Sequence, residues 1–307
     1  MRVAFDSRPA ADPRGIGRYT RSLLAALREE AAVRRGEIVE GQRPRAADVF
    51  HSPWIDGTQL RTACPMVVTL HDLVPLKRPG EYLRSGLRFR LRYLAVERAT
   101  RMIVPTVAVA EDAVALLDVE PARVHVVAEA ADATFTPRGA DEVARVRARH
   151  GLPEEYLVWV GGLRHPDPRK RVAALADAPR EVPLVLVGDP GQWARELPDV
   201  ILTGAVSDDE LAAIYTGARA LVFPSDDEGF GLPTVEALAC GTPVVACDVP
   251  ALREVLAGRA RFVDAGDLAG LLAAGAAARR PAPAPPAWTW EDAARSTWDA
   301  YRTALPA

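Results

Sequence analysis

The sequence predicts an α/β protein made of two doubly wound, Rossmann-like domains. Short apolar runs alternate with helical patterns almost throughout the chain, which is typical of parallel sheets covered by helices. The length of 307 residues exceeds what one ordinary hydrophobic core supports. A polar stretch without a strong strand signal, residues 132–153, separates the apolar runs into two series. We therefore expect two domains, at residues 1–140 and 150–280.

Each series supplies the strands of one sheet. A proline-rich spacer at 279–288 follows the second series, and an amphipathic helix is expected after it, from about residue 290 to 305. Further helices are expected at 18–30, 87–100 and 208–216. The expected strands are 2–5, 48–52, 65–70, 101–105 and 124–128 in the first domain, and 156–162, 183–189, 200–204, 220–225, 242–247 and 260–264 in the second.

Composition excludes several classes of protein. The net charge of -3 argues against a nucleic-acid-binding protein. The three cysteines, Cys64, Cys240 and Cys247, form no C-x-x-C pair and are expected to be small buried thiols. The N-terminus has no apolar signal core, and no apolar run is long enough to span a bilayer. We expect a cytoplasmic protein, or one attached at most to the inner face of the membrane.

The tetrapeptide Ser-Asp-Asp-Glu occurs twice and predicts two different structures. At Ser207–Glu210 it precedes "LAAIYTGA" and forms a capping box that starts a helix. At Ser225–Glu228 it precedes "GFGLP", whose glycines and proline oppose a helix at once. The helix is therefore expected to begin at Pro233 and to stop at Gly241.

This places a glycine-rich loop, residues 226–232, between a buried strand and a helix N-terminus. Ligands bind at that edge of a parallel sheet, and free backbone N–H groups at a helix start attract anions. Glu228 is expected at the mouth of the loop and Glu236 in the first helical turn, where carboxylates can accept hydrogen bonds from ribose or sugar hydroxyls. The alternative is that Glu236 is a favourable first-turn charge and Glu228 a solvated loop acid.

"EGFGLPTVEALACGTPVV" resembles the Glu-x7-Glu signature of the retaining family 4 glycosyltransferases, which have the GT-B fold. "DSRPAADPRGIGRYTRSLLAAL" is similar to the first strand, glycine loop and helix of that family, and "VFHSP", "VVTLHDLVPL" and "VGGLRHPDPRKR" follow in the family's order. The last segment, 289–307, resembles the helix that crosses back and completes the first domain. The resemblance implies two domains that face each other across a cleft.

For the second domain, the resemblance implies a binding site for a nucleotide diphosphate sugar. Glu228 would bind donor-sugar hydroxyls, and Glu236 the ribose. Arg169 and Lys170 match the basic pair that neutralises the leaving diphosphate, and Val206 lies where the family contacts the base. The backbone N–H groups of four residues would cradle the sugar and diphosphate: Gly229, Phe230, Gly231 and Leu232.

For the first domain, the resemblance implies that Gly15 and Gly17 form a loop that approaches the phosphates. His71 matches a residue near the reacting sugar carbon, where it would orient or polarise rather than serve as an obligatory base. Asp72 is expected to cap the following turn. Retention of the anomeric configuration is implied, by front-face attack in which the leaving phosphate oxygen takes the acceptor's proton.

The chemistry of the residues agrees with these roles. Negative charge develops on the diphosphate as the anomeric C–O bond breaks, and two fixed cations with a helix N-terminus stabilise it. No metal is then needed, and the sequence shows no metal-ligand cluster. Asp226 and Asp227 could imitate a metal-binding pair, but we interpret them as loop acids.

The function expected is a retaining hexosyltransferase of mannose or glucose type, with a GDP- or UDP-sugar as donor and no cofactor. Its acceptor would be a hydroxyl of a glycan, a lipid-linked molecule or a small molecule; "GIGRYT" leans toward mannosyl transfer. The alternatives are a GT-B sugar phosphorylase or sucrose synthase-like enzyme, and a nucleotide-sugar-binding protein with a decayed acceptor site.

Three departures from the family motivate that last alternative. The first domain is trimmed, because only one short strand, "EIVE", fits between the first helix and "HS". Thr106 is the one hydroxyl left in "VPTVAV", a turn where the family is serine-rich. "AEAAD" stands where the family has "PNG", and lacks both the proline and the glycine.

The arginine-rich segment 77–98 has two interpretations. Leucines form one helical stripe and arginines another. The segment could dock on anionic lipids as a peripheral membrane contact. We favour a helix packed on the sheet with a solvated basic face. The leucine stripe is Leu87, Leu91 and Leu94, and the arginine stripe is Arg84, Arg88 and Arg92.

Overall fold

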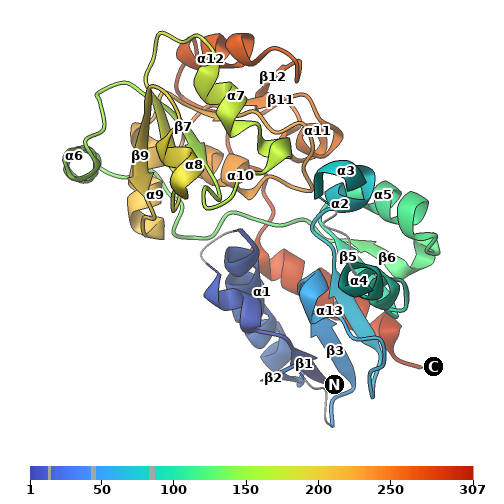
Figure 1. Cartoon of the computed structure of the whole chain (residues 1–307). Helices are drawn as coiled ribbons and strands as arrows, with labels where there is room; N and C mark the ends of the chain where they lie inside the picture. The colour runs from blue at the N-terminus through green and yellow to red at the C-terminus, as the bar shows by residue number, and fades with distance from the viewer. Residues whose placement is uncertain (13–14, 43–45, 83–86, 307) are drawn as a thin grey trace. The chain divides into compact units, whose positions relative to one another are not determined.

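The computed structural model describes residues 1–12, 15–42, 46–82 and 87–306, with the side chains of 87–90 outside the description. The chain divides into two compact units. Unit 1 comprises Met1–Ala130 and Trp288–Ala307, and unit 2 comprises Ala131–Ala287. Each unit contains its own parallel sheet flanked by helices (Figure 1).

Unit 1 holds a six-stranded sheet in the order β2-β1-β3-β4-β5-β6, with every pairing parallel. Its inner strands are almost wholly buried because helices cover both faces. "EIVE", the one short strand that fits between the first helix and "HS", forms β2 at the edge of the sheet. The strands are β1 Arg2–Phe5, β2 Glu37–Glu40, β3 Val49–Ser52, β4 Met66–Thr69, β5 Arg101–Val104 and β6 Val124–Val126.

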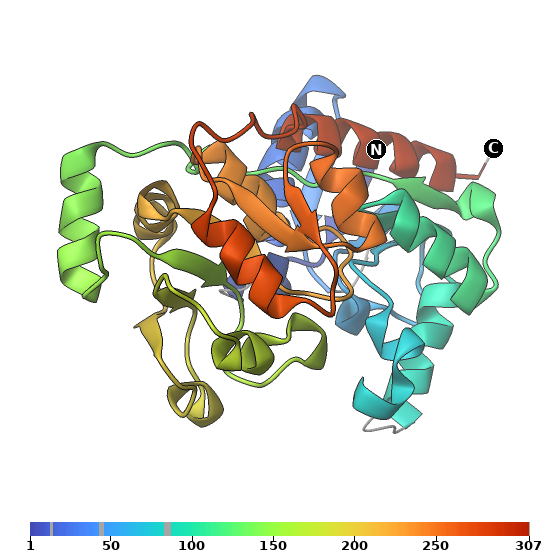
Figure 2. The ribbon, with the colours of Figure 1, turned by 90° about the horizontal axis from the view of Figure 1, so that it is seen from above.

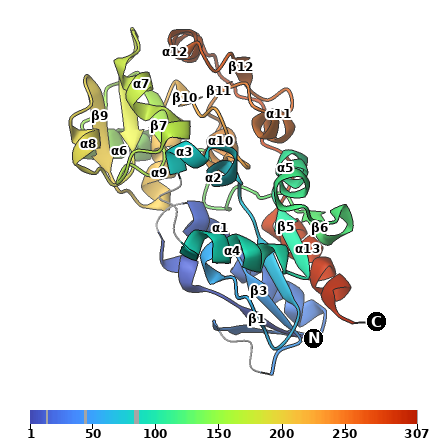
Figure 3. The ribbon, with the colours of Figure 1, turned by 45° about the vertical axis from the view of Figure 1, so that its right-hand side comes forward.

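The helices of unit 1 include one from the far end of the sequence. The last helix, α13, starts at a capping box made by Thr289 and Asp292 and packs against α1 (Figures 1 and 3). It thereby joins the unit formed by the first 130 residues. The helices are α1 Gly15–Val33, α2 Val74–Lys77, α3 Pro79–Tyr82, α4 Leu87–Glu97, α5 Val107–Leu117 and α13 Trp290–Ala304; short 3-10 turns lie at Arg8–Ala11, Ile55–Gly57 and Pro121–Arg123.

Unit 2 holds a second six-stranded parallel sheet in the order β12-β11-β10-β7-β8-β9. Its core is built from the apolar runs read in the sequence, with Leu157, Trp159 and Val222 among the side chains buried completely or nearly so. The strands are β7 Leu157–Val160, β8 Leu184–Val187, β9 Val200–Gly204, β10 Ala220–Phe223, β11 Val244–Cys247 and β12 Arg261–Val263.

One helix of unit 2 lies in the polar stretch expected to separate the domains. Helix α6, Ala140–His150, packs against α9 through a narrow apolar face that buries Val146, and lies at the periphery of the unit (Figure 2). The capping box at Ser207 is confirmed as the start of α9. The other helices are α7 Val172–Asp177, α8 Gln192–Arg195, α9 Asp208–Gly217, α10 Leu232–Ala239, α11 Pro250–Leu256 and α12 Leu268–Ala276, with a 3-10 turn at Pro168–Lys170.

The basic segment 77–98 differs from expectation in its buried face. Among the described side chains of α4, those of Tyr93, Ala95 and Val96 are buried, whereas Leu91 and Leu94 are each 37% exposed. Leu91 and Leu94 therefore do not cover the sheet. Arg92 forms an ion pair with Asp56 at 2.9 Å. Arg84 and the side chains of Leu87 and Arg88 lie outside the described residues. In the described part of the chain, none of the helices combines the length and hydropathy that crossing a membrane requires.

Candidate active site

In unit 2, the carboxyl ends of β7 and β10 form the natural place for a ligand. The chain runs outward from β7 through β8 to β9 on one side, and from β10 through β11 to β12 on the other. The strand order therefore reverses between β7 and β10, and such switch points hold the ligands of doubly wound sheets. The segment 161–170 follows β7, and the glycine-rich loop follows β10.

The glycine-rich loop ends at a position where glycine is the residue that fits without strain. Gly231 has a φ of +85°, and an added Cβ would lie 2.6 Å from Leu252. Helix α10 begins at Leu232, one residue before the expected start at Pro233, so proline takes the second position. The first turn is tightened by Thr234, whose amide and hydroxyl donate to the Gly231 carbonyl at 2.8 and 2.7 Å.

Arg169 and Glu228 meet at this switch point. The amide of Asp226 donates to the carbonyl of Arg169 at 3.0 Å, which ties the two loops together. Nη1 of Arg169 lies 3.7 Å from Oε2 of Glu228, whose side chain is only 10% exposed. Within the part of the chain that the structure describes, Oε1 of Glu228 is buried without a hydrogen-bond donor. Lys170 ends the same 3-10 turn as Arg169.

Glu236 is more deeply placed than the sequence indicated. It lies in the second turn of α10 rather than the first, since no acidic residue occupies the first turn. Its side chain is fully buried, and Oε2 accepts a hydrogen bond from the Tyr215 hydroxyl at 3.1 Å. Tyr215 comes from α9, and sequence reasoning missed it because "IYTGA" reads only as the apolar face of a helix.

The remaining predicted donor-binding residues offer mainly backbone. The side chains of Phe230 and Leu232 are buried, so their main chain is what remains available near the loop. Among the described residues, the amides of Gly231 and Leu232 have no backbone acceptor. Gly229 precedes them in the same loop. Val206 is half-buried and follows β9, the edge strand beyond β7 and β8.

In unit 1, the strand order reverses between β1 and β3. Asp6 follows β1, and its fully buried carboxylate accepts hydrogen bonds from Arg8 Nε at 2.8 Å and from Trp54 Nε1, beyond β3, at 2.9 Å. Burial alone would raise the pKa of Asp6, but these bonds and the charge of Arg8 outweigh it and lower the pKa. The Arg8 guanidinium also lies 5.5 Å from the centre of the Trp54 ring.

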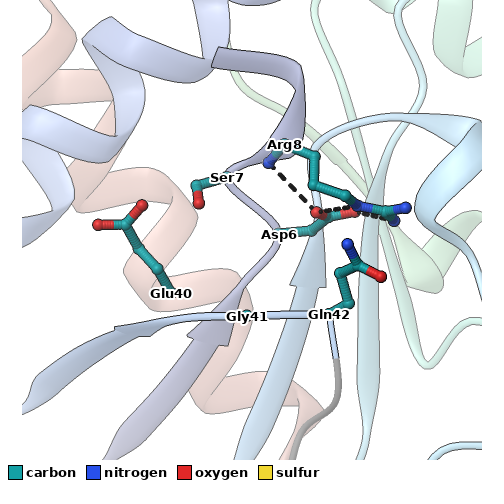
Figure 4. A pocket seen from close by; sticks show the side chains of 6 residues that line it. All are labelled: Asp6, Ser7, Arg8, Glu40, Gly41 and Gln42. Atoms are coloured by element: carbon teal, nitrogen blue, oxygen red, sulfur yellow. Dashed lines mark hydrogen bonds and ion pairs between the residues drawn. The ribbon is translucent and has the colours of Figure 1, made fainter. Parts of the chain in front are cut away.

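A polar cavity of about 580 Å³ opens beside this cluster. Figure 4 shows the Asp6 carboxylate joined to Arg8 beside Gln42, with Ser7 and Glu40 on the other side of Asp6. Glu40 is itself paired with Arg28, so the carboxylates of the cavity have cationic partners. Such a set of side chains suits a hydroxyl-rich molecule. Sequence reasoning did not single it out, although "DSR" stands directly after the first strand.

His71 lies at the same edge, directly after β4. Its Nε2 lies 3.0 Å from the Pro53 carbonyl and its Nδ1 lies 3.1 Å from Oε1 of Glu129, which follows β6. The ring of Tyr19 meets His71 edge-on at 4.5 Å. Glu129 was not predicted to be a site residue. The available signal was its place in "AEAAD", the segment that departs from the family pattern. Asp72 caps its turn as expected, since its Oδ1 accepts from the Val74 amide at 3.2 Å.

Gly15 and Gly17 do not form a loop. Both lie in the first turn of α1. A Cβ on Gly17 would come within 1.7 Å of the Asp12 carbonyl oxygen, so close backbone packing within unit 1 explains this glycine, whereas Gly15 has nothing within 4 Å. Thr106 serves as the N-cap of α5, accepting from the Val109 amide. Groups of three or more potential metal ligands are absent from the residues described.

Two family models match the chain. The model described as Glycosyltransferase Family 4 matches residues 8–135, and the one described as Glycosyl transferases group 1 matches residues 154–278. The second range contains the strands and loops of the unit 2 region, whereas the first begins after β1 and Asp6 and contains the rest of the unit 1 region.

Curated relatives agree with the models. The chain is 33% identical over 318 residues to a D-inositol 3-phosphate glycosyltransferase of Frankia alni, covering 86% of this chain and 76% of the relative. It is 34% identical to the protein of that name from Mycolicibacterium gilvum, covering 72% of this chain and 55% of the relative. It is 29% identical to the serotype-specific mannosyltransferase WbdA of Escherichia coli, covering 66% and 27%. The chain thus spans about half the length, or less, of several relatives it matches.

Solved structures match the whole fold. The structure of Anabaena Alr3699/HepE in complex with UDP and glucose has a TM-score of 0.68 and 17% identity, and the match covers 98% of this chain and 95% of that one. The family models and the relative from Frankia alni together show that the chain belongs to the family 4 glycosyltransferases, and the solved structure shows that it has their GT-B fold.

Proposed function

We propose that the chain is a retaining hexosyltransferase that uses neither a metal nor a cofactor. It moves a mannose- or glucose-type sugar from a GDP- or UDP-sugar to a hydroxyl of a glycan, a lipid-linked molecule or a small molecule. The observation that carries the proposal is the Arg169–Glu228 pair at the switch point of unit 2. One buried oxygen of the Glu228 carboxylate is free to accept a hydrogen bond from a sugar hydroxyl.

The charges suit departure of a diphosphate. Arg169 and Lys170 supply two adjacent cations. The N-terminus of α10 adds the backbone amides of Gly231 and Leu232, which have no backbone acceptor among the described residues. Preorganised donors of this kind stabilise charge that develops in the transition state. Glu228 would hold a donor-sugar hydroxyl, while Glu236, fixed by Tyr215, would bind the ribose.

The relatives favour particular substrates. A mannosyltransferase among them supports a mannose-type sugar, and the similar structure containing UDP supports a uridine donor. The relatives named for D-inositol 3-phosphate support a small polyol as acceptor. The polar cavity beside Asp6 and Arg8 offers hydrogen-bonding groups for such a molecule.

The test combines nucleotide binding with turnover. We expect one of UDP, GDP, dTDP and ADP to raise the melting temperature selectively, because a ligand that binds only the folded state stabilises it. With the matching nucleotide sugar, Lys170→Ala and Glu228→Gln should each lower kcat by about 100-fold. NMR of the product should show the donor's anomeric configuration, and EDTA should leave the rate unchanged.

The chain has only two lysines, so Lys77→Ala is a natural control. Lys77, on α2, donates to the Asp112 carboxylate of α5 at 3.0 Å. Its replacement by alanine should leave turnover intact. Near-normal activity of both site variants would refute the site assignment. The absence of a melting shift with all four nucleotides would refute the donor class.

A further inference from the structure

Both ring nitrogens of His71 face hydrogen-bond acceptors. The Pro53 carbonyl oxygen, 3.0 Å from Nε2, cannot donate, so Nε2 carries a proton. Glu129 Oε1 lies 3.1 Å from Nδ1. If Nδ1 carried no proton, its lone pair would face a carboxylate lone pair at hydrogen-bond distance. A second proton therefore lies between Nδ1 and Oε1, and the pair shares two protons in all.

The surroundings place that second proton on the ring. Glu129 is 3% exposed, and a buried carboxylate needs a cationic partner. Asp72, the next residue in the chain, adds a second negative charge, while Tyr19 covers the ring edge-on. Burial lowers the pKa of His71, but the hydrogen bond and charge of Glu129, with smaller effects of Pro53 and Asp72, raise it above its ordinary value.

The other histidine of this region does not compete for the charge. His51 is fully buried between the Tyr301 hydroxyl at 2.6 Å and the Thr69 hydroxyl at 2.9 Å. Burial first, and the nearby charge of His71 second, lower the pKa of His51 to about 3. His51 is therefore neutral at physiological pH, and His71 carries the positive charge.

We propose that Glu129 is a positioning residue that keeps His71 as a fixed imidazolium and so withholds it from the role of general base. For the catalytic consequence, the inference rests on the proposed function. With no lone pair on His71, the acceptor's proton goes to the leaving phosphate oxygen. The acceptor O–H and the C1–O(phosphate) bonds break, while the C1–O(acceptor) and O–H(phosphate) bonds form.

The inference fixes the sign of a pH dependence. As pH rises through the raised pKa of His71, the Nδ1 proton is lost and the ring faces an unprotonated carboxylate, so turnover should fall on the alkaline side. In Glu129→Gln the amide can donate to an unprotonated Nδ1. The neutral ring is then favoured, and the alkaline limb should move to lower pH or disappear.

The proton state can be read without any substrate. Two-dimensional ¹⁵N–¹H spectra of the histidine rings report whether each nitrogen is protonated, and His71→Gln identifies the His71 signals among the five histidines. At pH 6.5, the ordinary pKa of a histidine ring, we expect both nitrogens of His71 to be mainly protonated in the parent protein and only one in Glu129→Gln. A neutral His71 in the parent protein at that pH would overturn the proposal.

The turnover measurement separates positioning from a purely structural role. Glu129→Gln should lower kcat by about 100-fold, with a smaller change in the donor KM. The loss in rate is expected because a displaced His71 ring lowers kcat by about that factor. Glu129→Asp, which keeps the charge, should recover part of the loss. Glu111→Gln, on the exposed side of α5, is the matched control and should change neither quantity.

Folding and function are distinguished by the same set of variants. Melting temperatures show whether each variant folds, and Glu129→Asp keeps the charged partner if Glu129→Gln does not fold. Full kcat with an unchanged pH profile in Glu129→Gln would overturn the positioning role. If the parent protein turns over none of the donors, the proposed function fails, and the ring spectra still decide the state of His71.

Discussion

Glu228 and Glu236 lie on one short segment, yet the fold gives them different environments. Glu228 precedes α10 and is loosely paired with Arg169, so one of its oxygens keeps its acceptor capacity. Glu236 lies inside α10, where its carboxylate is fully buried and anchored by Tyr215. A buried carboxylate with a neutral donor depends strongly on that donor. The role proposed for Glu236 therefore depends on Tyr215.

Removing the Tyr215 hydroxyl tests this dependence. Tyr215→Phe should cost about 1.5–3 kcal/mol in urea denaturation, because the bond it removes is made to a carboxylate that stays buried. It should also weaken nucleotide binding if Glu236 holds the ribose, and calorimetric titration would measure that loss.

Tyr156→Phe is the matched control in the same unit. Its hydroxyl donates to the Ile214 carbonyl at 2.7 Å, whereas that of Tyr215 donates to Glu236. It should cost about 1 kcal/mol, as for a neutral bond, and leave nucleotide affinity unchanged. Equal nucleotide affinity in Tyr215→Phe and the parent protein would refute a role for Glu236 in binding ribose.

Sequence patterns identified single residues where the chemistry is local. Asp72 and Ser207 cap the turns they precede, and both were predicted because capping depends on neighbours within a few positions. Glu129 and Tyr215 were missed because their partners are 58 and 21 residues away in sequence. Only the tertiary fold brings them together. Gly17 was assigned to a ligand loop, whereas its close neighbour is the Asp12 carbonyl of its own chain.

At the scale of elements, the two Ser-Asp-Asp-Glu copies show how context changes a local signal. Ser207 accepts from the Glu210 amide at 3.2 Å and starts α9. Ser225 is fully buried, and in the described structure its hydroxyl has no partner. The difference comes from Gly229 and Gly231, which let the second copy continue as a loop.

The two serines should therefore respond differently to alanine. Ser207→Ala should destabilise unit 2 by about 1 kcal/mol, the usual cost of losing an N-cap. Ser225→Ala removes a buried hydroxyl that makes no bond, so it should be neutral or slightly stabilising. Urea denaturation of both variants measures the contrast. A loss at Ser225 equal to that at Ser207 would contradict the assignment of Ser225 to a loop.

The strands were predictable because most of them are buried. The expected strands all formed, because buried parallel strands appear as short continuous apolar runs such as "LVLV" in β8. Helix α6 was not predicted, since it buries little more than Val146 and is stabilised by packing on α9. Leu91 and Leu94 of α4 were expected on the buried face, but Tyr93 and Val96 pack into the core there instead.

At the scale of the whole molecule, the return of α13 makes unit 1 depend on both ends of the chain. Trp298 and Tyr301 are almost completely buried, and a Cβ on Gly36 would lie 2.5 Å from the Trp298 ring. The Tyr301 hydroxyl also begins a buried polar chain that runs through His51 and Thr69 to Tyr19, which contacts His71. The far end of the sequence thus supports the surroundings of a proposed site residue.

A chain ending at Ala287 tests this dependence. It loses three buried aromatic side chains, Trp290, Trp298 and Tyr301, each worth about 3–5 kcal/mol, against a total stability of about 5–15 kcal/mol for a typical domain. We expect unit 1 to unfold while unit 2, whose core lies within residues 131–287, keeps its fold and its stabilisation by nucleotide. Hydrogen exchange should show lost protection in α1 and β3 and retained protection in β7 and β10. A chain ending at Leu305, which keeps all of α13, is the matched control. Full protection of α1 in the shorter chain would show that unit 1 folds without its last helix.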